Sequence, residues 1–209
     1  MPSGPSGPLR PRAEGPVKKV ICLSGLSGTG KSTIGRRLAE LYGLRYVSGG
    51  EALREKAREL GYEPSGPGWW EGPEGRKFME ERLKNPRFDR EVDDWLLQLA
   101  HEGGVVIDSW TIAWLLDEGV GLKICLYGSA KVRARRVAER DGLPPEEALR
   151  ALLGKEELTS EIYERIYGFD LWDLSPFDLV VDTDNLGPDE VLATIRAVVE
   201  SMRARGEFR

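Results

Sequence analysis

Cysteine, histidine and long hydrophobic runs are all scarce in this sequence of 209 residues. The two cysteines, Cys22 and Cys125, each lie inside a short apolar run, and the single histidine is His101. Two isolated cysteines and one histidine cannot form a cysteine–histidine zinc site. We therefore interpret both cysteines as small buried hydrophobic residues in a reducing compartment. No apolar run approaches the ~18 residues of a membrane-spanning helix, and the first residues hold no apolar signal core, so we expect a cytoplasmic protein without a membrane partner.

An excess of positive charge is also missing. The chain has 30 Lys and Arg against 35 Asp and Glu, a net charge of −5, and this balance argues against nucleic acid as a partner. Hydrophobic residues make up 40%, which is typical of a globular chain. Residues 1–16 are rich in proline, glycine and serine and are expected to form a disordered tail. The length favours one domain over residues 17–209, and we expect a monomer.

A complete phosphate-binding loop occupies residues 25–32, which read G-L-S-G-T-G-K-S. Glycines let backbone N–H groups curl around phosphates, the lysine places a charge on the β- and γ-phosphates of ATP, and the last serine is a ligand for Mg²⁺. The context fits as well, since residues 17–24 read as a buried strand and residues 31–42 as a helix. The residues predicted to bind ATP are Gly25, Ser27, Gly28, Thr29, Gly30, Lys31, Ser32 and Thr33, with Lys31 also catalytic.

Strands and helices alternate through the rest of the chain. Further strands are predicted at residues 44–47, 105–108, 122–127 and 177–181, and helices at 51–60, 85–102, 129–140, 144–154 and 188–203. Residues 61–75, with their many glycines and prolines, are predicted to be a mobile or irregular insert. This order predicts a three-layer α/β sandwich around a parallel sheet. Ligands then bind beyond the carboxyl ends of the strands, where Ser48, Gly50 and Asp108 should meet the phosphate loop.

Three kinds of side chain are candidates for chemistry at that edge. Asp108 can hold Mg²⁺ through water or accept a proton from an attacking hydroxyl, or it can simply cap the helix expected near residues 111–117. Arg54 can clamp an acceptor phosphate, or it can pair with Glu51 or Glu55. Tryptophans cluster near the insert and the third strand (Trp69, Trp70, Trp110 and Trp114); they can wall an acceptor pocket, although core packing is the better interpretation for Trp114.

Four arginines lie on the helix predicted at residues 129–140. Arg133, Arg136 and Arg140 share one face of it, whereas Arg135 does not. Arginines stabilise the charge that develops on a transferred phosphoryl group, so Arg136 and Arg140 are predicted to be catalytic, with Arg136 also contacting ATP. The alternative is an ordinary exposed basic face, which carries more weight for Arg133 and Arg135 than for Arg136 and Arg140.

Several strings, in order, resemble the archaeal-type cytidylate kinases of the nucleoside monophosphate kinase superfamily. They are the phosphate loop and the segments 47–54 (VSGGEALR), 88–93 (FDREVD), 132–140 (VRARRVAER), 166–170 (IYGFD), 173–175 (DLS) and 177–180 (FDLV). The resemblance covers most of residues 18–200, and the string I-Y-G-x-D followed by D-L-S is its most group-specific part.

The resemblance implies a five-stranded P-loop fold with an acceptor-binding part at about 48–102 and a lid at about 143–168. Arg54 would match the family's acceptor-phosphate arginine, and Arg136 and Arg140 its lid-proximal arginines. Residues 182–185 would border adenine. Two positions depart from the family pattern: Trp110 stands where the family has an acceptor-binding arginine, and Ile162 stands where it has a lid arginine. Lys155 and Arg165 are possible substitutes for the second.

Three functions remain open from the sequence. The first is an ATP- and Mg²⁺-dependent cytidylate kinase acting on CMP or dCMP, with Ser48, Gly50, Arg54 and Trp110 binding the acceptor. The second is a kinase of the same fold that phosphorylates a hydroxyl of a nucleoside or another small compound, with Asp108 as general base. The third is a nucleotide-gated regulatory ATPase without a small acceptor. A fold alone does not decide among them.

Overall fold

The computed structural model describes residues 19–208 and contains a five-stranded parallel sheet with the order β2-β3-β1-β4-β5. Its strands are β1 (Val20–Ser24), β2 (Arg45–Ser48), β3 (Val105–Asp108), β4 (Leu122–Tyr127) and β5 (Leu179–Asp182). The predicted parallel α/β sheet is therefore confirmed, with β2 and β5 displaced by one or two residues from the predicted ranges. The central position of β1 puts the phosphate loop, which follows it, at the middle of the sheet's carboxyl edge.

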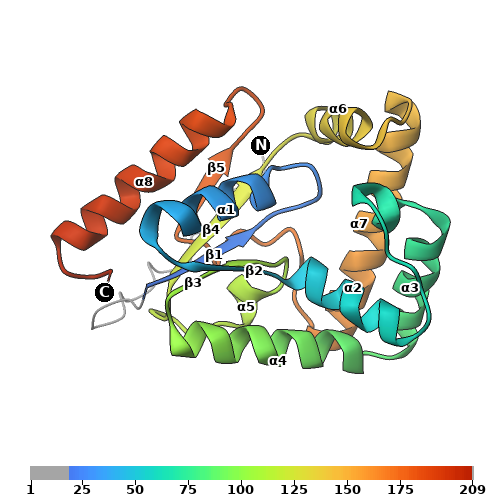
Figure 1. Ribbon diagram of the computed structural model, residues 1–209, viewed down its shortest axis with the longest axis horizontal. Coiled ribbons are helices and arrows are strands. Elements are labelled where there is room, and N and C mark those ends of the chain that lie inside the picture. The colour runs from blue at the N-terminus through green and yellow to red at the C-terminus, as the bar shows by residue number, and fades with distance from the viewer. Residues whose placement is uncertain (1–18, 209) are drawn as a thin grey trace, which may run out of the picture.

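Helices cover both faces of this sheet (Figure 1). On one face, α1 (Lys31–Tyr42) and α8 (Pro188–Ala204) pack through residues such as Leu38 and Ile195 onto Ile21 and Ile124. On the other, α2 (Gly49–Glu59), α4 (Arg87–Glu102) and the short α5 (Ile112–Leu115) enclose the second core. The strands carry apolar side chains on both faces of the sheet, so both faces must be covered by helices. The three-layer sandwich is confirmed.

The remaining helices form a separate flank beyond the carboxyl edge of the sheet, on the right of Figure 1. They are the 3₁₀ helix η1 (Pro67–Glu71), α3 (Pro73–Lys84), α6 (Ala130–Asp141) and α7 (Pro145–Tyr167). Their residues supply two further apolar clusters, one around Met79, Ile162 and Tyr163 and one where Val137 packs with Leu152. This flank faces the phosphate loop across the candidate site.

Two predictions about this flank are wrong at least in part. The irregular insert predicted at residues 61–75 holds for residues 61–66, which contain no helix or strand, and is wrong for the rest, because η1 and the start of α3 lie there and Trp69 packs against Phe78 in the core. The helix predicted to end at residue 154 continues to Tyr167. Buried side chains at helical spacing, including Leu152, Thr159 and Ile162, hold α7 together past its internal glycine, which shows tertiary packing overriding a local breaker.

Both cysteines are buried and free, as expected, and burial raises the pKa of the Cys22 thiol to about 12. The predicted disordered tail of residues 1–16 falls outside the described residues. Across residues 19–208, no helix combines the length and the apolar character needed to cross a bilayer.

Candidate active site

The phosphate loop has the glycine conformations that its sequence demands. Gly25 has φ +137°, and a Cβ built there would lie 2.2 Å from the Leu126 carbonyl oxygen. Gly28 has φ +80°, and its Cβ would come within 2.8 Å of the Arg133 carbonyl oxygen. Gly30 caps α1 in the left-handed region. Only glycine fits this path between β4 and α6, and the path ends at the N-terminus of α1, where helical N–H groups attract anions.

Lys31 opens α1 and turns its side chain back over the loop. Its Nζ donates to the Leu26 carbonyl oxygen at 3.1 Å and lies 5.7 Å from the centre of the Trp110 ring. Burial lowers the pKa of Lys31, while the Asp108 carboxylate acts in the opposite direction. Within the part of the chain that the structure describes, this carbonyl is the one hydrogen-bond partner of the ammonium group, which leaves two N–H donors for an anion.

Ser32 and Asp108 meet directly beside the loop. Ser32 Oγ donates to Asp108 Oδ2 at 2.7 Å, and Tyr46 Oη donates to the same oxygen at 2.9 Å. These are hard oxygen donors of the kind that Mg²⁺ prefers, and a serine with a nearby carboxylate suits an ion that keeps most of its waters. The helix-capping alternative for Asp108 is wrong, because Thr111 stands at the N-cap of α5.

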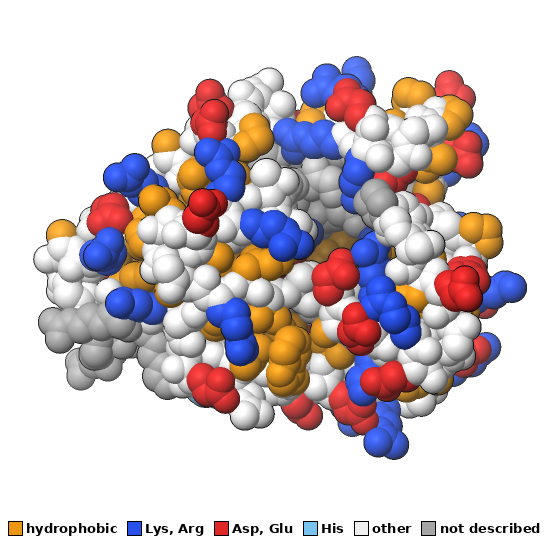
Figure 2. All heavy atoms as spheres, in the orientation of Figure 1, with side chains coloured by type: hydrophobic (Ala, Val, Ile, Leu, Met, Phe, Trp, Pro, Cys, Tyr) orange, Lys and Arg blue, Asp and Glu red, His pale blue; other side chains and the backbone are white. Residues whose placement is uncertain are grey.

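One cleft of about 570 Å³ runs along the carboxyl edge of the sheet. Figure 2 shows the surface hollowed between the part built on α1 and the flank that carries α6 and α7, with basic side chains near the opening. All the predicted site residues except Gly25 line this cleft: Ser27, Gly28, Thr29, Gly30, Lys31, Ser32, Thr33, Ser48, Gly50, Arg54, Asp108, Trp110, Arg136 and Arg140. Gly25 lies behind the loop and shapes it.

The arginines of α6 have different surroundings. Arg136 donates to the Gly28 carbonyl oxygen at 3.2 Å and to Thr183 Oγ1 at 2.9 Å, so it joins the loop to the segment after β5. Arg140 is partly exposed and bonds to Asp141 at the end of α6. The exposed-face interpretation holds for Arg135 but is wrong for Arg133, which is 3% exposed.

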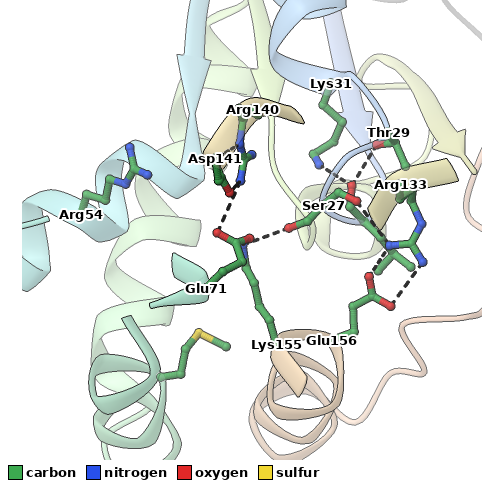
Figure 3. A network of polar contacts seen from close by, with 12 residues as sticks. Ser27, Thr29, Lys31, Arg54, Glu71, Arg133, Arg140, Asp141, Lys155 and Glu156 are labelled. Carbon is green, nitrogen blue, oxygen red and sulfur yellow. Dashed lines mark hydrogen bonds and ion pairs between the residues drawn. The ribbon is translucent and has the colours of Figure 1, made fainter. Parts of the chain in front are cut away.

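Arg133 makes a buried ion pair with Glu156 of α7. Both guanidinium nitrogens Nη1 and Nη2 face the two carboxylate oxygens, with Nη2 and Oε2 3.3 Å apart. Arg133 Nε also donates to the Gly128 carbonyl oxygen at 2.7 Å, and Nη1 reaches the Ser27 carbonyl oxygen at 3.3 Å. This one side chain therefore fastens α7 to the phosphate loop (Figure 3).

Lys155 is a second link from α7 to the loop. Its Nζ lies 2.9 Å from Ser27 Oγ and 3.1 Å from Glu71 Oε1. Glu71, whose side chain is 2% exposed, also faces Arg140 at 3.5 Å, so that one carboxylate lies between two cations at the centre of Figure 3. Burial lowers the pKa of Lys155, and Glu71 opposes that shift. Lys155 thus brings a cation of α7 to the cleft, whereas Ile162 is fully buried in an apolar cluster.

Arg54 and two tryptophans, Trp70 and Trp110, line further parts of the cleft. Arg54 bonds to Glu51 Oε1 at 2.9 Å and to the Gly66 carbonyl oxygen at 3.0 Å, so the alternative pairing with Glu51 is present while the side chain still lines the cleft. Trp110 and Trp70 also line it, each within 6 Å of Lys155. Trp114 stacks on Phe169 at 4.8 Å, which confirms core packing for that residue.

Sequence reasoning did not identify the polar far end of the cleft, which is lined by Arg82, Asp89 and Asp93. Arg82 of α3 pairs with Asp89 of α4, and Asp93 accepts from Thr111 and Tyr167. The signal was present for the two carboxylates, because Asp89 and Asp93 share the α4 face that buries Val92 and Leu96. A carboxylate on the apolar stripe of a helix needs a partner. No comparable signal marks Glu71, whose place depends on the fold of η1.

Fold and site together define a P-loop phosphotransferase: a five-stranded parallel sheet, a glycine loop with Lys31 and Ser32 at a helix N-terminus, and a carboxylate on the neighbouring strand. Residues 20–185 match the model of the cytidylate kinase-like family, and the chain belongs to that family.

Curated relatives cover nearly the whole chain. The cytidylate kinase of Ignicoccus hospitalis is 36% identical over 180 residues, which is 86% of this chain and 98% of that protein. The cytidylate kinase of Pyrococcus horikoshii is 35% identical over 190 residues, 91% and 93% of the two chains.

Solved structures at low identity share the fold. A protein from Eubacterium ventriosum superimposes with a TM-score of 0.59 at 18% identity, covering 88% of this chain and 99% of its own. Shikimate kinase from Acinetobacter baumannii superimposes with a TM-score of 0.53 at 19% identity, covering 88% and 94%. Both show that the fold is shared and nothing finer.

Proposed function

We propose that the protein transfers the terminal phosphoryl group of ATP to CMP or dCMP, giving ADP and CDP or dCDP. The observation that carries the proposal is the cleft itself, which joins a phosphate loop to a second, polar end across one continuous space. Relatives named cytidylate kinase at about 35% identity over most of the chain supply the acceptor class. All residues used here belong to one chain, so a monomer suffices.

The ATP phosphates would lie in the loop formed by Ser27 to Thr33, with Lys31 Nζ on the β- and γ-phosphates. Ser32 and Asp108 would hold Mg²⁺, and this ion, when bound, neutralises charge on the transferred group. In this arrangement Asp108 would serve the metal ion rather than act as a general base, because Ser32 and Tyr46 already donate hydrogen bonds to one of its oxygens. A phosphate acceptor is itself anionic and needs no general base.

The adenine end would lie beside Arg136 and the segment after β5. Arg136 is held there by Thr183, and Thr183, Leu186 and Pro188 line the same end of the cleft. A guanidinium plane against a flat base is a favourable arrangement.

The acceptor would enter from the side of α2, within the part that spans about 48–102. Arg54 is placed to exchange Glu51 for the acceptor phosphate, a substitution of one anion for another on the same guanidinium. Ser48, which caps α2, and Gly50 would contact the acceptor there, and Trp110 offers a flat wall beside Lys31.

Residues 143–168 would act as the lid, with Lys155 as its cation over the transferred phosphoryl group. Lys155→Met is expected to lower kcat about 10- to 100-fold, because a preorganised positive charge in a dry site stabilises the developing negative charge. Lys155→Arg should retain most of the rate. Steady-state ADP formation with saturating CMP measures the effect.

The matched control is the double variant Glu71→Gln with Lys155→Met. It removes the buried carboxylate that Lys155→Met alone would leave with only Arg140, 3.5 Å away, as a cationic neighbour among the described residues, so it separates a folding defect from a catalytic one. The double variant should recover the thermal stability of the parent and keep the low kcat. A double variant with the parent's kcat would exclude a direct role for Lys155.

An acceptor panel tests the function as a whole. ADP release is measured with CMP, dCMP, UMP, AMP, free nucleosides and small polyols, each against a blank without acceptor. Strong stimulation by CMP or dCMP is expected. Stimulation confined to uncharged alcohols, or turnover that does not depend on any acceptor, would refute the proposal.

A further inference from the structure

The far end of the cleft contains two buried carboxylates with different partners. Asp89 is fully engaged by Arg82, whose Nη2 lies 2.5 Å from Oδ1 and whose Nε lies 3.1 Å from Oδ2. Asp93 lies one helical turn further along α4 and also lines the cleft, at 5% exposure. The two residues therefore present different chemistry to a ligand.

Asp93 accepts hydrogen bonds only from hydroxyl groups among residues 19–208. Thr111 Oγ1 donates to Oδ1 at 2.5 Å and Tyr167 Oη donates to Oδ2 at 2.6 Å. Each carboxylate oxygen can accept more than one hydrogen bond, so acceptor capacity remains on a side chain that lines an open space. No lysine or arginine of the described part of the chain forms an ion pair with it.

This arrangement is costly for folding alone. Burial raises the pKa of Asp93 to about 6; the hydroxyls of Thr111 and Tyr167 and the charge of Arg82 lower it, and Asp89 raises it further. A buried carboxylate that forms no ion pair destabilises the fold, so its presence at a cleft indicates a functional role.

We propose that Asp93 reads the exocyclic amino group of the acceptor's base and thereby selects cytosine over uracil. The inference rests on the proposed function and deepens it, since it assigns the base-reading contact within the same cleft. Cytosine presents an N4 amino donor, and aspartate is a natural acceptor for it. Uracil carries a carbonyl oxygen at that position, which would face the carboxylate with two acceptors opposed.

Neighbouring groups complement the rest of a cytosine edge. Among residues 19–208, Arg82 Nη1 donates only to the thioether sulfur of Met79, at 2.8 Å, and a thioether is a weak acceptor. This nitrogen is thus a donor for the ring acceptors N3 or O2. Trp70 and Tyr163 line the same end, each with its ring centre 5.9 Å from the Arg82 guanidinium carbon, and they supply flat surfaces for a base.

Asp93→Asn tests the contact directly. The substitution keeps the shape, removes the charge and replaces one acceptor oxygen with a donor. The ratio of kcat/KM for CMP to that for UMP is expected to fall at least about tenfold, since a site built around a hydrogen bond discriminates strongly against the wrong partner. The exposed neighbour Asp94→Asn is the matched control and should leave the ratio unchanged.

The parent protein provides an independent test through pH. Above its pKa of about 6, Asp93 is an acceptor; below it, the protonated carboxyl can donate to the uracil carbonyl. The CMP to UMP ratio is therefore expected to fall as the pH decreases from 7.5 to 5.5. Titration of the acceptor phosphate is common to both nucleotides and cancels in the ratio.

The outcomes separate the two proposals. A parent protein that does not phosphorylate CMP overturns the proposed function and this inference together. A parent that uses CMP, with a CMP to UMP ratio unaffected by Asp93→Asn and by pH, overturns this inference alone. Equal loss of both activities in Asp93→Asn, with a flat pH dependence of the ratio, assigns Asp93 to structure and has the same consequence.

Discussion

Replacing Lys31 by methionine is expected to lower the rate of phosphoryl transfer to any acceptor by about 10³-fold or more. Phosphoryl transfer depends almost entirely on positioning and charge stabilisation, and a 10³-fold loss corresponds to roughly 4 kcal/mol of barrier. Lys31 places its charge directly at the glycine loop, with its Nζ 3.1 Å from the Leu26 carbonyl oxygen. ADP formation with CMP, and with every other acceptor that the parent accepts, measures the loss.

The same substitution should not weaken the fold, and this makes the prediction diagnostic. Burial lowers the pKa of Lys31, so the folded state disfavours the charged form and the ammonium group costs stability at neutral pH. Methionine has a similar length and no charge to desolvate. The free energy of unfolding is expected to stay equal or to rise slightly.

Lys131→Met is the matched control, because Lys131 is an exposed lysine near the start of α6 and carries no predicted role. It should leave both rate and stability unchanged. If Lys31→Met retained more than a tenth of the parent's activity, the phosphate-loop assignment would have to be abandoned. If it unfolded the protein instead, the charge would be a structural one.

The central part of the fold was predictable because its signals are local. The glycines at 25, 28 and 30, the strand before them and the helix after them are read from consecutive residues, and β3, β4 and α1 match their predicted bounds. The meeting of Ser32 and Asp108 was predictable because the loop with Ser32 follows one parallel strand and Asp108 ends another. Parallel strands bring their carboxyl ends to one edge, so residues that follow them meet.

The flank was not predictable because its order comes from long-range contacts. Local composition marks residues 61–75 as irregular, yet Trp69 and Phe78 fold them against the core. Arg133 looks like one of several basic residues on an exposed face. Its partner Glu156 is 23 residues away, and nothing in the spacing of the two indicates that they meet.

Polar contacts at the boundary between sheet and flank give the cleft its shape. Arg133 and Lys155 bind the loop to α7, and Glu71 joins α7 to η1 and α6. Closing such a boundary with buried charges costs desolvation, which apolar contacts would avoid. We infer that Lys155 and Glu71 are placed at this boundary for phosphate chemistry rather than for stability. Arg133, in contrast, mainly stabilises the fold.

Arg133→Met is expected to lower the free energy of unfolding by about 3–5 kcal/mol, because it leaves Glu156 as a buried charge without its partner. Glu156 is 3% exposed and cannot regain solvent without moving α7. For a chain of this size such a loss corresponds to a decrease in Tm of roughly 10 °C. Denaturant unfolding and thermal melting of the full chain measure it.

The double variant Arg133→Met with Glu156→Leu should recover about 2 kcal/mol of that loss, since removing both charges also removes the desolvation penalty. Recovery should be incomplete, because the Gly128 and Ser27 carbonyl oxygens lose the donors that Arg133 supplies. Leu152→Ala, which removes apolar packing from the same helix, is the control for general damage to α7 and should show no such rescue by Glu156→Leu. Additive effects of the two charge substitutions would mean that Arg133 and Glu156 do not stabilise each other, and that α7 is fastened to the phosphate loop by Lys155 instead.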